Sequence, residues 1–301
     1  MRVLEAVDRQ WAEGRLPEPA SADFLRWLHR DFYRGASRAR LMLEGSGRRV
    51  RFEPGEWRSR PEHDVAVGRH VPPASARVGD FMRRFEERYR FADLGPMARI
   101  LCMATAHHRL GYLHPFADGN GRVARLMSHA MGLWSGIGAH GLWSISRGLA
   151  RGLRDRGEYL QMMELADSPR RSDLDGRGNL SEEALEEFAL WFLRVCLDQV
   201  AFMERLFELP TLAGRLRALA GQERALGPAG GALLAETLHR GELDRGAAPA
   251  ATGLPERSAR RVLQAVLQAG LLGSDTPKGP VSLRFPVETL DVLFPRLYAP
   301  G

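Results

Sequence analysis

The sequence has very little lysine and cysteine, and it lacks long apolar runs. Lys278 is the only lysine among 43 basic residues, so arginine carries nearly all of the positive charge. Arginine suits phosphate or nucleic-acid binding because its guanidinium group forks onto phosphate oxygens. A general compositional bias towards Arg, Ala and Gly would give the same excess. The net charge of +6 therefore permits such ligands without requiring them.

The two cysteines, Cys102 and Cys196, both lie in apolar helical patterns, which favours buried thiols over a disulfide. No apolar run approaches the roughly 20 residues that a membrane-spanning helix needs. Residues 1–5 also lack the apolar core of a secretory signal. With 44% apolar and 27% charged residues, the composition is typical of a globular protein. We therefore expect a cytoplasmic protein with no membrane partner.

Helical periodicity dominates the chain. In residues 24–33 apolar side chains recur at helical spacing, at i, i+3 and i+7 for Leu25, Leu28 and Phe32, which marks one face of an amphipathic helix. The same kind of pattern predicts further helical segments at 78–89, 95–113, 120–131, 149–163 and 181–207. The sequence therefore predicts a mainly α fold, with an N-terminal helical region at 1–50 and a core at 51–226.

One segment of the core, 65–73, has a different pattern. It reads Val-Ala-Val-Gly-Arg-His-Val-Pro-Pro, which is β-branched and closed by two prolines. This predicts a strand or hairpin arm with a rigid exit. Because an isolated hairpin is only marginally stable, we expect it to lie over the helices. By contrast, residues 45–60 show no helical face and contain a turn signal at Pro54-Gly55.

The C-terminal third predicts a separate small domain at 231–301. Residues 227–231 are rich in Gly, Pro and Ala, so we expect a linker there. Two helical segments and two short strands follow, at 232–238, 254–267, 271–274 and 281–285. This order is typical of a winged helix-turn-helix. Arginines on the second helix suit phosphate contacts, but nearby acidic residues leave the domain almost neutral, so docking of DNA and docking of a protein both stay open.

The segment 114–125 contains the residues that indicate chemistry. Glycines in a tight loop before a helix N-terminus expose backbone N–H groups to an anion and let a phosphate approach closely. Arg122 and Arg125 are three residues apart and so lie on one helical face. Asp118 is an oxygen ligand suited to Mg²⁺ carried by a polyphosphate, and His114 can act as a base near neutral pH. Each feature alone has a structural explanation, but together they indicate phosphoryl or nucleotidyl transfer.

This segment reads His-Pro-Phe-Ala-Asp-Gly-Asn-Gly-Arg-Val-Ala-Arg. It resembles the signature loop of the Fic family, His-Pro-Phe-x-(Asp/Glu)-Gly-Asn-Gly-Arg-x-x-Arg, at every fixed position. Residues 65–73 are similar to the family's β-hairpin flap, and 173–181 resemble a loop that is common after its core. The resemblance covers about residues 50–205. It implies a Fic-type helical bundle with a flap, followed by a small winged-helix domain, which is a frequent companion.

The resemblance also implies roles for individual residues. His114 would deprotonate a hydroxyl of a target protein, Asp118 would hold Mg²⁺ against the phosphates of ATP, and Phe116 would pack into the core. Contacts to the phosphates are implied for Gly119, Asn120, Gly121, Arg122 and Arg125. The flap would receive the target's backbone as an added strand, through Val67, Gly68, Arg69 and His70. From the residues alone, an ordinary hairpin and a surface histidine at position 70 are the simpler interpretations.

Two other segments partly match known motifs, one inhibitory and one calcium-binding. Many Fic proteins carry an inhibitory helix, Ser/Thr-x-x-x-Glu-(Gly/Asn), and Glu44-Gly45 matches its end. Because Arg40 stands where Ser or Thr is required, we interpret Glu44 as a plain helix terminus. The segment 173–179 has the acidic spacing of a calcium loop but lacks its closing glutamate, so we interpret it as a structural turn.

The sequence therefore predicts an enzyme that transfers AMP from Mg-ATP to a hydroxyl group of an unidentified target protein. Three alternatives stay open. The chain could be a DNA-binding regulator or a toxin–antitoxin-type module whose Fic core senses nucleotide. It could run the reaction in reverse and remove AMP, or it could use another phosphate donor. A homodimer is also compatible with the sequence.

Overall fold

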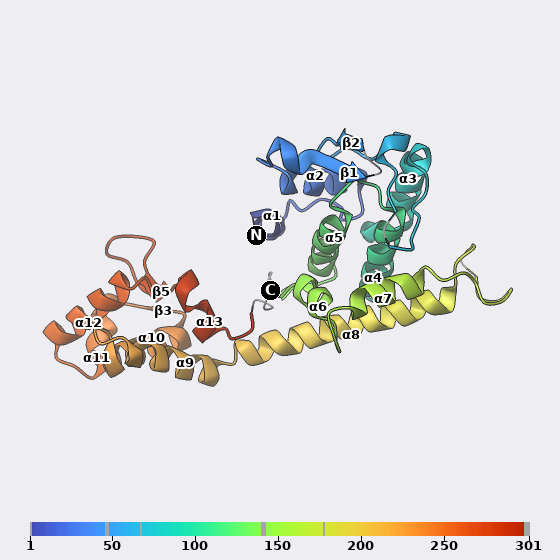
Figure 1. Cartoon of the computed structure of the whole chain (residues 1–301). Coiled ribbons are helices and arrows are strands. Elements are labelled where there is room, and N and C mark those ends of the chain that lie inside the picture. The colour runs from blue at the N-terminus through green and yellow to red at the C-terminus, as the bar shows by residue number, and fades with distance from the viewer. Residues whose placement is uncertain (1, 46–47, 67, 140–142, 177, 298–301) are drawn as a thin grey trace. The chain divides into compact units, whose positions relative to one another are not determined.

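The structure is a computed structural model that describes residues 2–45, 48–66, 68–139, 143–176 and 178–297. The chain divides into two compact units, Met1–Val200 and Ala201–Gly301. This division falls within one helix and not near residues 227–231. Helices form most of both units (Figure 1). Among the described residues, no helix combines the length and the apolar character that a membrane span requires.

The first unit is a bundle of helices. It is made of α1 (Arg2–Ala12), α2 (Ala22–Phe32), α3 (Val78–Arg88), α4 (Pro96–Leu113), α5 (Asn120–Trp134), α6 (Ile145–Arg151), α7 (Glu158–Ala166) and α8 (Glu182–Leu206). The periodic segments of the sequence correspond to α2, α3, α4, α5 and α8. Segment 149–163 covers two helices, because Gly152 takes a positive φ of 70° and ends α6.

Helices α4 and α5 pack against each other at the centre of this unit. Apolar residues surround most of both helices, which is typical of helices that are buried on several sides. Their fully buried side chains include Met103, Ala106, Leu110, Met127 and Ala130. Both cysteines are buried free thiols, Cys102 on α4 and Cys196 on α8. The signature loop connects these two central helices.

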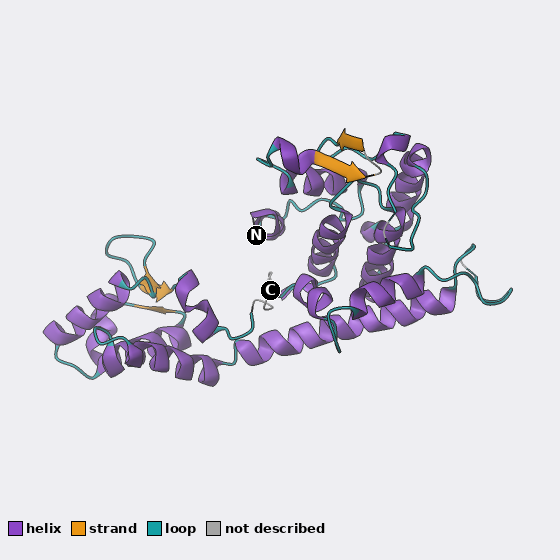
Figure 2. Ribbon diagram, in the orientation of Figure 1, coloured by secondary structure: helices purple, strands orange, loops and turns teal. Residues whose placement is uncertain are grey.

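The strands of the first unit do not lie where the sequence placed them. β1 (Met42–Gly45) and β2 (Arg48–Arg51) form an antiparallel hairpin in register Leu43↔Val50 (Figure 2). Glu44 is therefore part of a strand, and the expectation of a helix terminus was wrong. Leu41 and Phe52, which flank the hairpin, pack in one cluster with Leu43 of β1 and with Tyr33, the C-cap of α2. That burial outweighs an arginine-rich sequence with weak β preference.

Segment 65–73 was expected to form a flap hairpin. In its described part, 65–66 and 68–73, only His70 takes part in a β-bridge. Val67 lies outside the described residues. The two prolines leave this stretch without the N–H groups that a continuing ladder would need. A hairpin at 65–73 therefore stays a prediction.

The second unit contains helices and a small sheet. Its helices are α9 (Leu209–Gln222), α10 (Gly227–Arg240), α11 (Ala248–Thr252), α12 (Glu256–Gln268) and α13 (Leu290–Leu293). Its strands β3 (Glu242–Leu243), β4 (Leu272–Gly273) and β5 (Val281–Leu283) pair antiparallel in the order β3-β5-β4. The core between them includes Leu216, Leu233, Leu234, Val266 and Val281. The helices expected at 232–238 and 254–267 correspond to α10 and α12, and β4 and β5 lie within the two expected strands, but β3 and α11 between the helices were not expected. The winged-helix assignment stays a prediction.

Residues 227–231 are not a linker, contrary to our expectation. They form the first turn of α10, with Pro228 at a position where its missing N–H leaves no bond unmade. Gly231 packs against α9 so closely that a Cβ atom would lie 3.0 Å from Cα of Arg217. The small residues of this segment therefore serve close packing between two helices.

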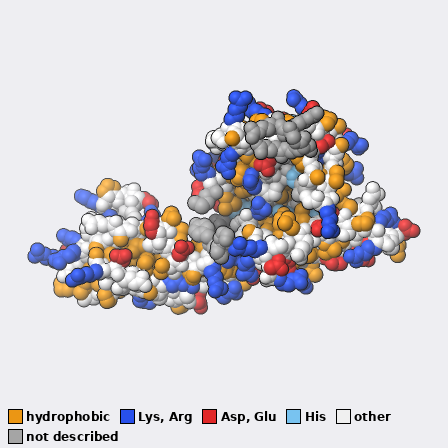
Figure 3. Space-filling view, viewed as in Figure 1, with side chains coloured by type: hydrophobic (Ala, Val, Ile, Leu, Met, Phe, Trp, Pro, Cys, Tyr) orange, Lys and Arg blue, Asp and Glu red, His pale blue; other side chains and the backbone are white. Residues whose placement is uncertain are grey.

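Basic side chains gather at one end of the second unit. Figure 3 shows Lys and Arg side chains at the end that carries α11 and α12. Arg257, Arg260 and Arg261 on α12 are exposed, and Arg260 is paired with Glu256.

Candidate active site

The signature loop begins where α4 ends. His114 caps α4 in the left-handed region, with φ 48°, and its N–H donates to Leu110 O. Residues other than Gly and Asn seldom adopt this conformation, so surrounding contacts must fix it. Gly119, with φ 81°, then forms the N-cap of α5. The N–H groups of Asn120 and Gly121 lie in the first turn of α5 and have no acceptor within the helix, so they are available to an anion.

The interior of the loop is closed by Asn120. Its Oδ1 accepts the N–H of Phe116 at 2.8 Å, and its Nδ2 donates to Phe116 O at 2.8 Å. The side chain of Asn120 is only 2% exposed. Both ends of the amide are thus used within the loop, and the backbone N–H is the group left for an anion.

Phe116 fixes the loop to the helices, as the resemblance implied. Its side chain is fully buried and its ring stacks on His29 of α2 at 4.0 Å between centroids, with 6° between the planes. The ring of Trp57 lies 4.5 Å from that of Phe116 between centroids. His29 accepts the N–H of Gly55 at Nδ1, so its Nε2 carries the hydrogen and donates to Asp118 O at 3.0 Å. Burial lowers the pKa of His29 to about 4, which keeps the ring neutral.

The loop and the first turns of α5 form one wall of a cavity of about 800 Å³. His114, Asn120, Gly121 and Arg125 line this wall. Gly68, Arg69 and His70 also line the cavity, together with Tyr159, Leu160 and Met163 of α7. A volume of this size is typical of small-molecule sites. Of the sequence-predicted residues, seven are therefore brought together: His114, Asn120, Gly121, Arg125, Gly68, Arg69 and His70.

His114 is neutral at physiological pH. Burial is the main cause that lowers its pKa to about 4, and the charges of Arg58 and His70 lower it further against a hydrogen bond to Gly111. Its Nδ1 lies 3.4 Å from Gly111 O, a group that can only accept. The hydrogen is therefore on Nδ1, and Nε2 presents a lone pair. This is the form that a general base needs.

Arg58 holds the backbone around His114, a role that no local sequence pattern indicated. Its side chain is 1% exposed. Nε donates to His114 O at 2.6 Å, and Nη2 donates to Leu113 O at 3.2 Å and to Pro73 O. Nη1 pairs with Asp64 at 2.7 Å. One guanidinium group thus connects the end of α4 to Asp64 and Pro73, which lie in the segment that precedes α3.

Asp118 does not line the cavity wall but lies against α2. Its Oδ2 accepts the hydroxyl of Tyr33, and Nη1 of Arg122 lies 3.6 Å away. Although burial alone would raise it, the pKa of Asp118 is lowered by hydrogen bonds from Tyr33 and Gly119 and by the charge of Arg122. The carboxylate is therefore ionised at neutral pH.

Arg122 and Arg125 face different surroundings. Nη1 of Arg122 donates to Tyr33 at 2.9 Å, and its guanidinium lies 4.9 Å from the ring centroid of Phe32. Arg125 instead lines the cavity with His114. Of these two arginines, only Arg125 therefore shares the cavity with His114, although both were expected at the same anion.

The residues around Asp118 fit a magnesium ion that arrives with a nucleotide. The Asp118 side chain is 46% exposed. In the described part of the chain, no group of three or more His, Cys, Asp or Glu could hold a metal ion. Mg²⁺ is commonly bound by one carboxylate together with substrate phosphates and water. Asp118 is the residue that would hold it.

A buried network behind the cavity orients Tyr159, another residue that sequence reasoning missed. Ser128 donates to Ala124 O, so Nδ1 of His107 donates to Ser128 at 2.8 Å and its Nε2 accepts the Tyr159 hydroxyl at 3.0 Å. Burial lowers the pKa of His107 to about 3. The neutral imidazole thus fixes the phenol in the cavity wall. Paired histidines in a helical pattern, His107 and His108, were the only sequence signal of this network.

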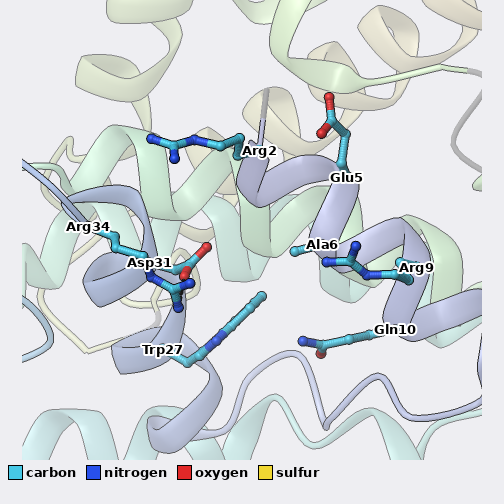
Figure 4. A pocket seen from close by; sticks show the side chains of 8 residues that line it. All are labelled: Arg2, Glu5, Ala6, Arg9, Gln10, Trp27, Asp31 and Arg34. Atoms are coloured by element: carbon cyan, nitrogen blue, oxygen red, sulfur yellow. Dashed lines mark ion pairs between the residues drawn. The ribbon is translucent and has the colours of Figure 1, made fainter.

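A second cavity, of about 450 Å³, lies between α1 and α2 (Figure 4). Arg2, Arg9 and Trp27 line it, and Arg34 there is paired with Asp31. No residue of 114–125 lines this cavity. The signature-loop cavity is therefore the candidate active site.

With this geometry established, the sequence model described as the Fic/DOC family matches residues 19–131. The match begins before α2 and ends within α5, so it includes the whole signature loop. The chain contains a Fic/DOC domain.

Relatives with the same domain are matched over part of their length. The protein adenylyltransferase Fic of Drosophila erecta is 35% identical over 80 residues, which is 27% of this chain and 16% of that protein. The protein of the same name from Drosophila ananassae is 38% identical over 80 residues, with the same shares. This chain thus spans about a sixth of the length of these relatives.

Two solved structures are similar to this chain. A Fic domain containing signaling protein from Bacteroides thetaiotaomicron VPI-5482 matches with a TM-score of 0.45 and 19% identity, over 67% of this chain and 68% of that chain. A Fic family protein from Desulfovibrio desulfuricans G20 matches with a TM-score of 0.47 and 18% identity, over 94% of this chain and 74% of that chain.

Proposed function

We propose that this protein is a Fic-type transferase that moves AMP from Mg-ATP to a hydroxyl group of a target protein. The observation that carries the proposal is the shared cavity of His114, Arg125 and the N-terminal turn of α5. A neutral base, a cation and free backbone N–H groups then face one space. The partial matches to proteins named protein adenylyltransferase Fic favour AMP as the transferred group.

In the proposed reaction, the target's hydroxyl oxygen attacks the α-phosphorus of ATP. The new bond joins this oxygen to phosphorus, the bond between the α-phosphorus and the bridging oxygen breaks, and pyrophosphate leaves. Nε2 of His114 takes the proton of the hydroxyl. The lowered pKa of His114 makes it a weak base, so the residue contributes mainly by position and the remaining catalysis comes from charge stabilisation.

The chain's other residues bind and orient the substrate. The N–H groups at the start of α5 and the guanidinium of Arg125 neutralise phosphate oxygens. When bound at Asp118, Mg²⁺ would neutralise further phosphate charge. Arg58 fixes the backbone of His114, and Asn120 keeps the loop closed around Phe116.

Transfer of label from ATP tests this function. The purified protein is incubated with a cell lysate, Mg²⁺ and ATP labelled either on the α-phosphate or on the γ-phosphate. We expect protein-bound label from the α-position alone, and its loss in His114→Ala. His239→Ala is the matched control, because His239 is an exposed histidine on α10. Label from the γ-position, or undiminished label in His114→Ala, would overturn the proposal.

The alternatives predict other outcomes of the same experiment. Release of AMP from a pre-labelled protein indicates the reverse reaction, and labelling by another nucleotide in preference to ATP indicates a different donor. We further propose that residues 231–301 form a winged helix-turn-helix that docks DNA or a partner protein. Salt-dependent and sequence-selective retention on DNA, lost when Arg257 and Arg261 are changed to Ala, would favour DNA.

A further inference from the structure

The second cavity lies where α1 packs against α2, and its volume of about 450 Å³ is typical of small-molecule sites (Figure 4). Helix α1 borders it with one face, since Arg2, Ala6 and Arg9 stand at the helical spacing i, i+4 and i+7. Ala6 lies between the two arginines, and its small side chain leaves space there. Trp27 of α2 also lines the cavity. The lining thus combines arginines with an aromatic ring.

The arginines of this cavity are only partly neutralised. Arg34 is paired with Asp31. Within the described part of the chain, the side chains of Arg2 and Arg9 form neither an ion pair nor a hydrogen bond. Two like charges on one helix face repel each other, and an anion in the cavity would be attracted by both. Arg2 and Arg9 therefore provide a site for a negatively charged group.

Three arginines and two carboxylates line the cavity, which leaves a net positive charge. The second carboxylate is that of Glu5, which is exposed and is directed away from Trp27 in Figure 4. The side chains of Arg9 and Gln10 extend instead towards the space beside the ring. Because water and salt screen an exposed charge, Glu5 weakens the attraction for an anion without cancelling it.

Trp27 is placed to contact a flat ring. Its own ring stacks on that of the buried Phe24, at 5.6 Å between centroids and 23° between the planes, which limits its movement. The side chain is half-buried and lines the cavity, so part of its surface is open to a ligand. Aromatic side chains bind nucleobases by stacking. The amide of Gln10, which is both a donor and an acceptor, can pair with the edge of a base.

Contacts outside the cavity hold α1 in place. Val3 and Val7 are buried on another face of this helix. Nε2 of His129 lies 2.6 Å from Oδ1 of Asp8, which connects α1 to α5. The cavity is therefore part of the folded unit, and a ligand would not have to order the helix that carries the arginines.

We propose that the cavity between α1 and α2 is a binding site for a nucleoside monophosphate, with the base stacked on Trp27 and the phosphate held by Arg9 and Arg2. An aromatic ring and a phosphate are the two groups that this lining recognises, and a mononucleotide joins them in one small molecule. The site goes beyond the proposed transferase and is independent of it, because no residue of 114–125 lines this cavity.

Fluorine NMR of the full chain labelled with 5-fluorotryptophan tests the site. The signal of Trp27 is identified by its absence in Trp27→Leu. AMP is the probe, ribose 5-phosphate is the compound that lacks the base, and adenosine is the compound that lacks the phosphate. Arg9→Gln removes one positive charge from the cavity. Arg15→Gln is the matched control, because Arg15 is exposed, is paired with Glu13 and does not line the cavity.

We expect AMP to shift the Trp27 signal and to bind at least about tenfold more tightly than ribose 5-phosphate or adenosine, since each of these lacks one of the two contacts. Arg9→Gln should weaken AMP binding about tenfold, which corresponds to one lost hydrogen bond to a charged group. Arg15→Gln should bind AMP as the wild type does. The signal of Trp143, whose Nε1 donates to Ile137 O, reports whether the variants remain folded.

Three results would overturn the site. In the first, the Trp27 signal does not move with AMP, or the wild type and Arg9→Gln bind AMP equally. In the second, ribose 5-phosphate binds as tightly as AMP, which means that the ring contributes nothing. In the third, a single-stranded oligonucleotide binds more tightly than AMP, which replaces the mononucleotide by a nucleic acid.

Failure of the proposed transferase gives a different result. Arg125→Ala changes the signature-loop cavity and should leave the Trp27 titration with AMP unchanged. If Arg125→Ala abolishes that titration, AMP is bound at the signature loop, and the second site is rejected. If ATP transfers no label while the Trp27 titration is intact, the transferase alone is rejected and the second site is supported.

Discussion

Nε of Arg58 lies 2.6 Å from the main-chain oxygen of His114. This contact fixes a backbone in the left-handed region and connects His114 to a residue 56 positions earlier in the chain. The arrangement around His114 thus depends on an arginine outside the signature motif. The contact also leads to a prediction that distinguishes substitutions of Arg58 from substitutions of neighbouring arginines.

Replacement of Arg58 by Ala should lower the free energy of unfolding by about 3 kcal/mol, because several buried carbonyl groups lose their donor. Arg58→Lys keeps the charge but cannot reach these acceptors together. We expect it to recover little of the stability and to transfer label at least about tenfold more slowly than the wild type. Urea unfolding and α-labelled ATP measure the two effects. Arg60→Ala, an exposed arginine two residues on, is the control and should change neither.

The buried neutral histidines predict loss of stability at acidic pH. Burial lowers the pKa of His29 to about 4 and of His107 to about 3, from an unfolded value of 6.5. Between these values the unfolded chain binds protons that the folded chain does not. The free energy of unfolding should therefore fall as the pH falls from about 6.5 to about 4, by up to about 1.4 kcal/mol per pH unit for each histidine.

Tryptophan fluorescence is the measurement for this prediction. All six tryptophans lie between residues 11 and 191, so the signal reports on the first unit alone. Urea midpoints at pH 7 and pH 5 should differ in the wild type. The difference should be smaller in His107→Gln and unchanged in the His239→Gln control. Equal wild-type midpoints at both pH values would contradict the prediction.

The Tyr33 hydroxyl predicts a change in magnesium dependence. Tyr33→Phe removes the donor to Asp118 and the acceptor of Arg122, so the carboxylate loses its fixed orientation. We expect about tenfold more Mg²⁺ to be needed for half-maximal binding of ATP, which corresponds to one lost hydrogen bond to a charged group. Calorimetric titration at fixed ATP measures this. Tyr89→Phe removes a hydroxyl elsewhere in the unit and should leave the dependence unchanged.

Gly231 predicts a packing defect in the second unit. A Cβ atom there would lie 3.0 Å from Cα of Arg217, so Gly231→Ala must push α9 and α10 apart. We expect destabilisation of this unit by about 1–3 kcal/mol. Gly214→Ala on α9 meets nothing within 4 Å and should be neutral or stabilising by up to about 1 kcal/mol. Hydrogen exchange in α10 distinguishes the two, and equal exchange in both variants would refute the packing argument.

Local sequence patterns predicted the centre of the fold and the loop that it carries. The periodicity of α4 and α5 is strong because burial dictates their apolar residues. In the loop, Gly119 adopts the positive φ that its glycine predicts. The hairpin β1–β2 was missed because its arginines give no alternation, and Leu41 and Phe52 outside it supply the burial. Such packing depends on residues distant in the sequence.

The same reason explains the errors in the candidate site. Arg58 and Tyr33 act through contacts 56 and 85 residues away along the chain, and neither position shows a local pattern. The glycines of 227–231 were interpreted as flexible because composition does not reveal that α9 packs so close that a Cβ atom at Gly231 would lie 3.0 Å from Cα of Arg217. His70 was assigned to the surface because its partners Tyr112 and Asp167 lie on other elements.

The last three carbonyl groups at the end of α4, those of Tyr112, Leu113 and His114, all accept hydrogen bonds from side chains of residues 58–70. A molecule in which residues 58–70 have lost these contacts keeps the sequence of the signature motif, but the side chain of His114 is no longer held in its orientation. Damage to or misfolding of residues 58–70 would therefore abolish the proposed transferase activity. The specific activity of a preparation would then report the fraction of molecules in which these contacts are intact, and it could be used to judge sample quality.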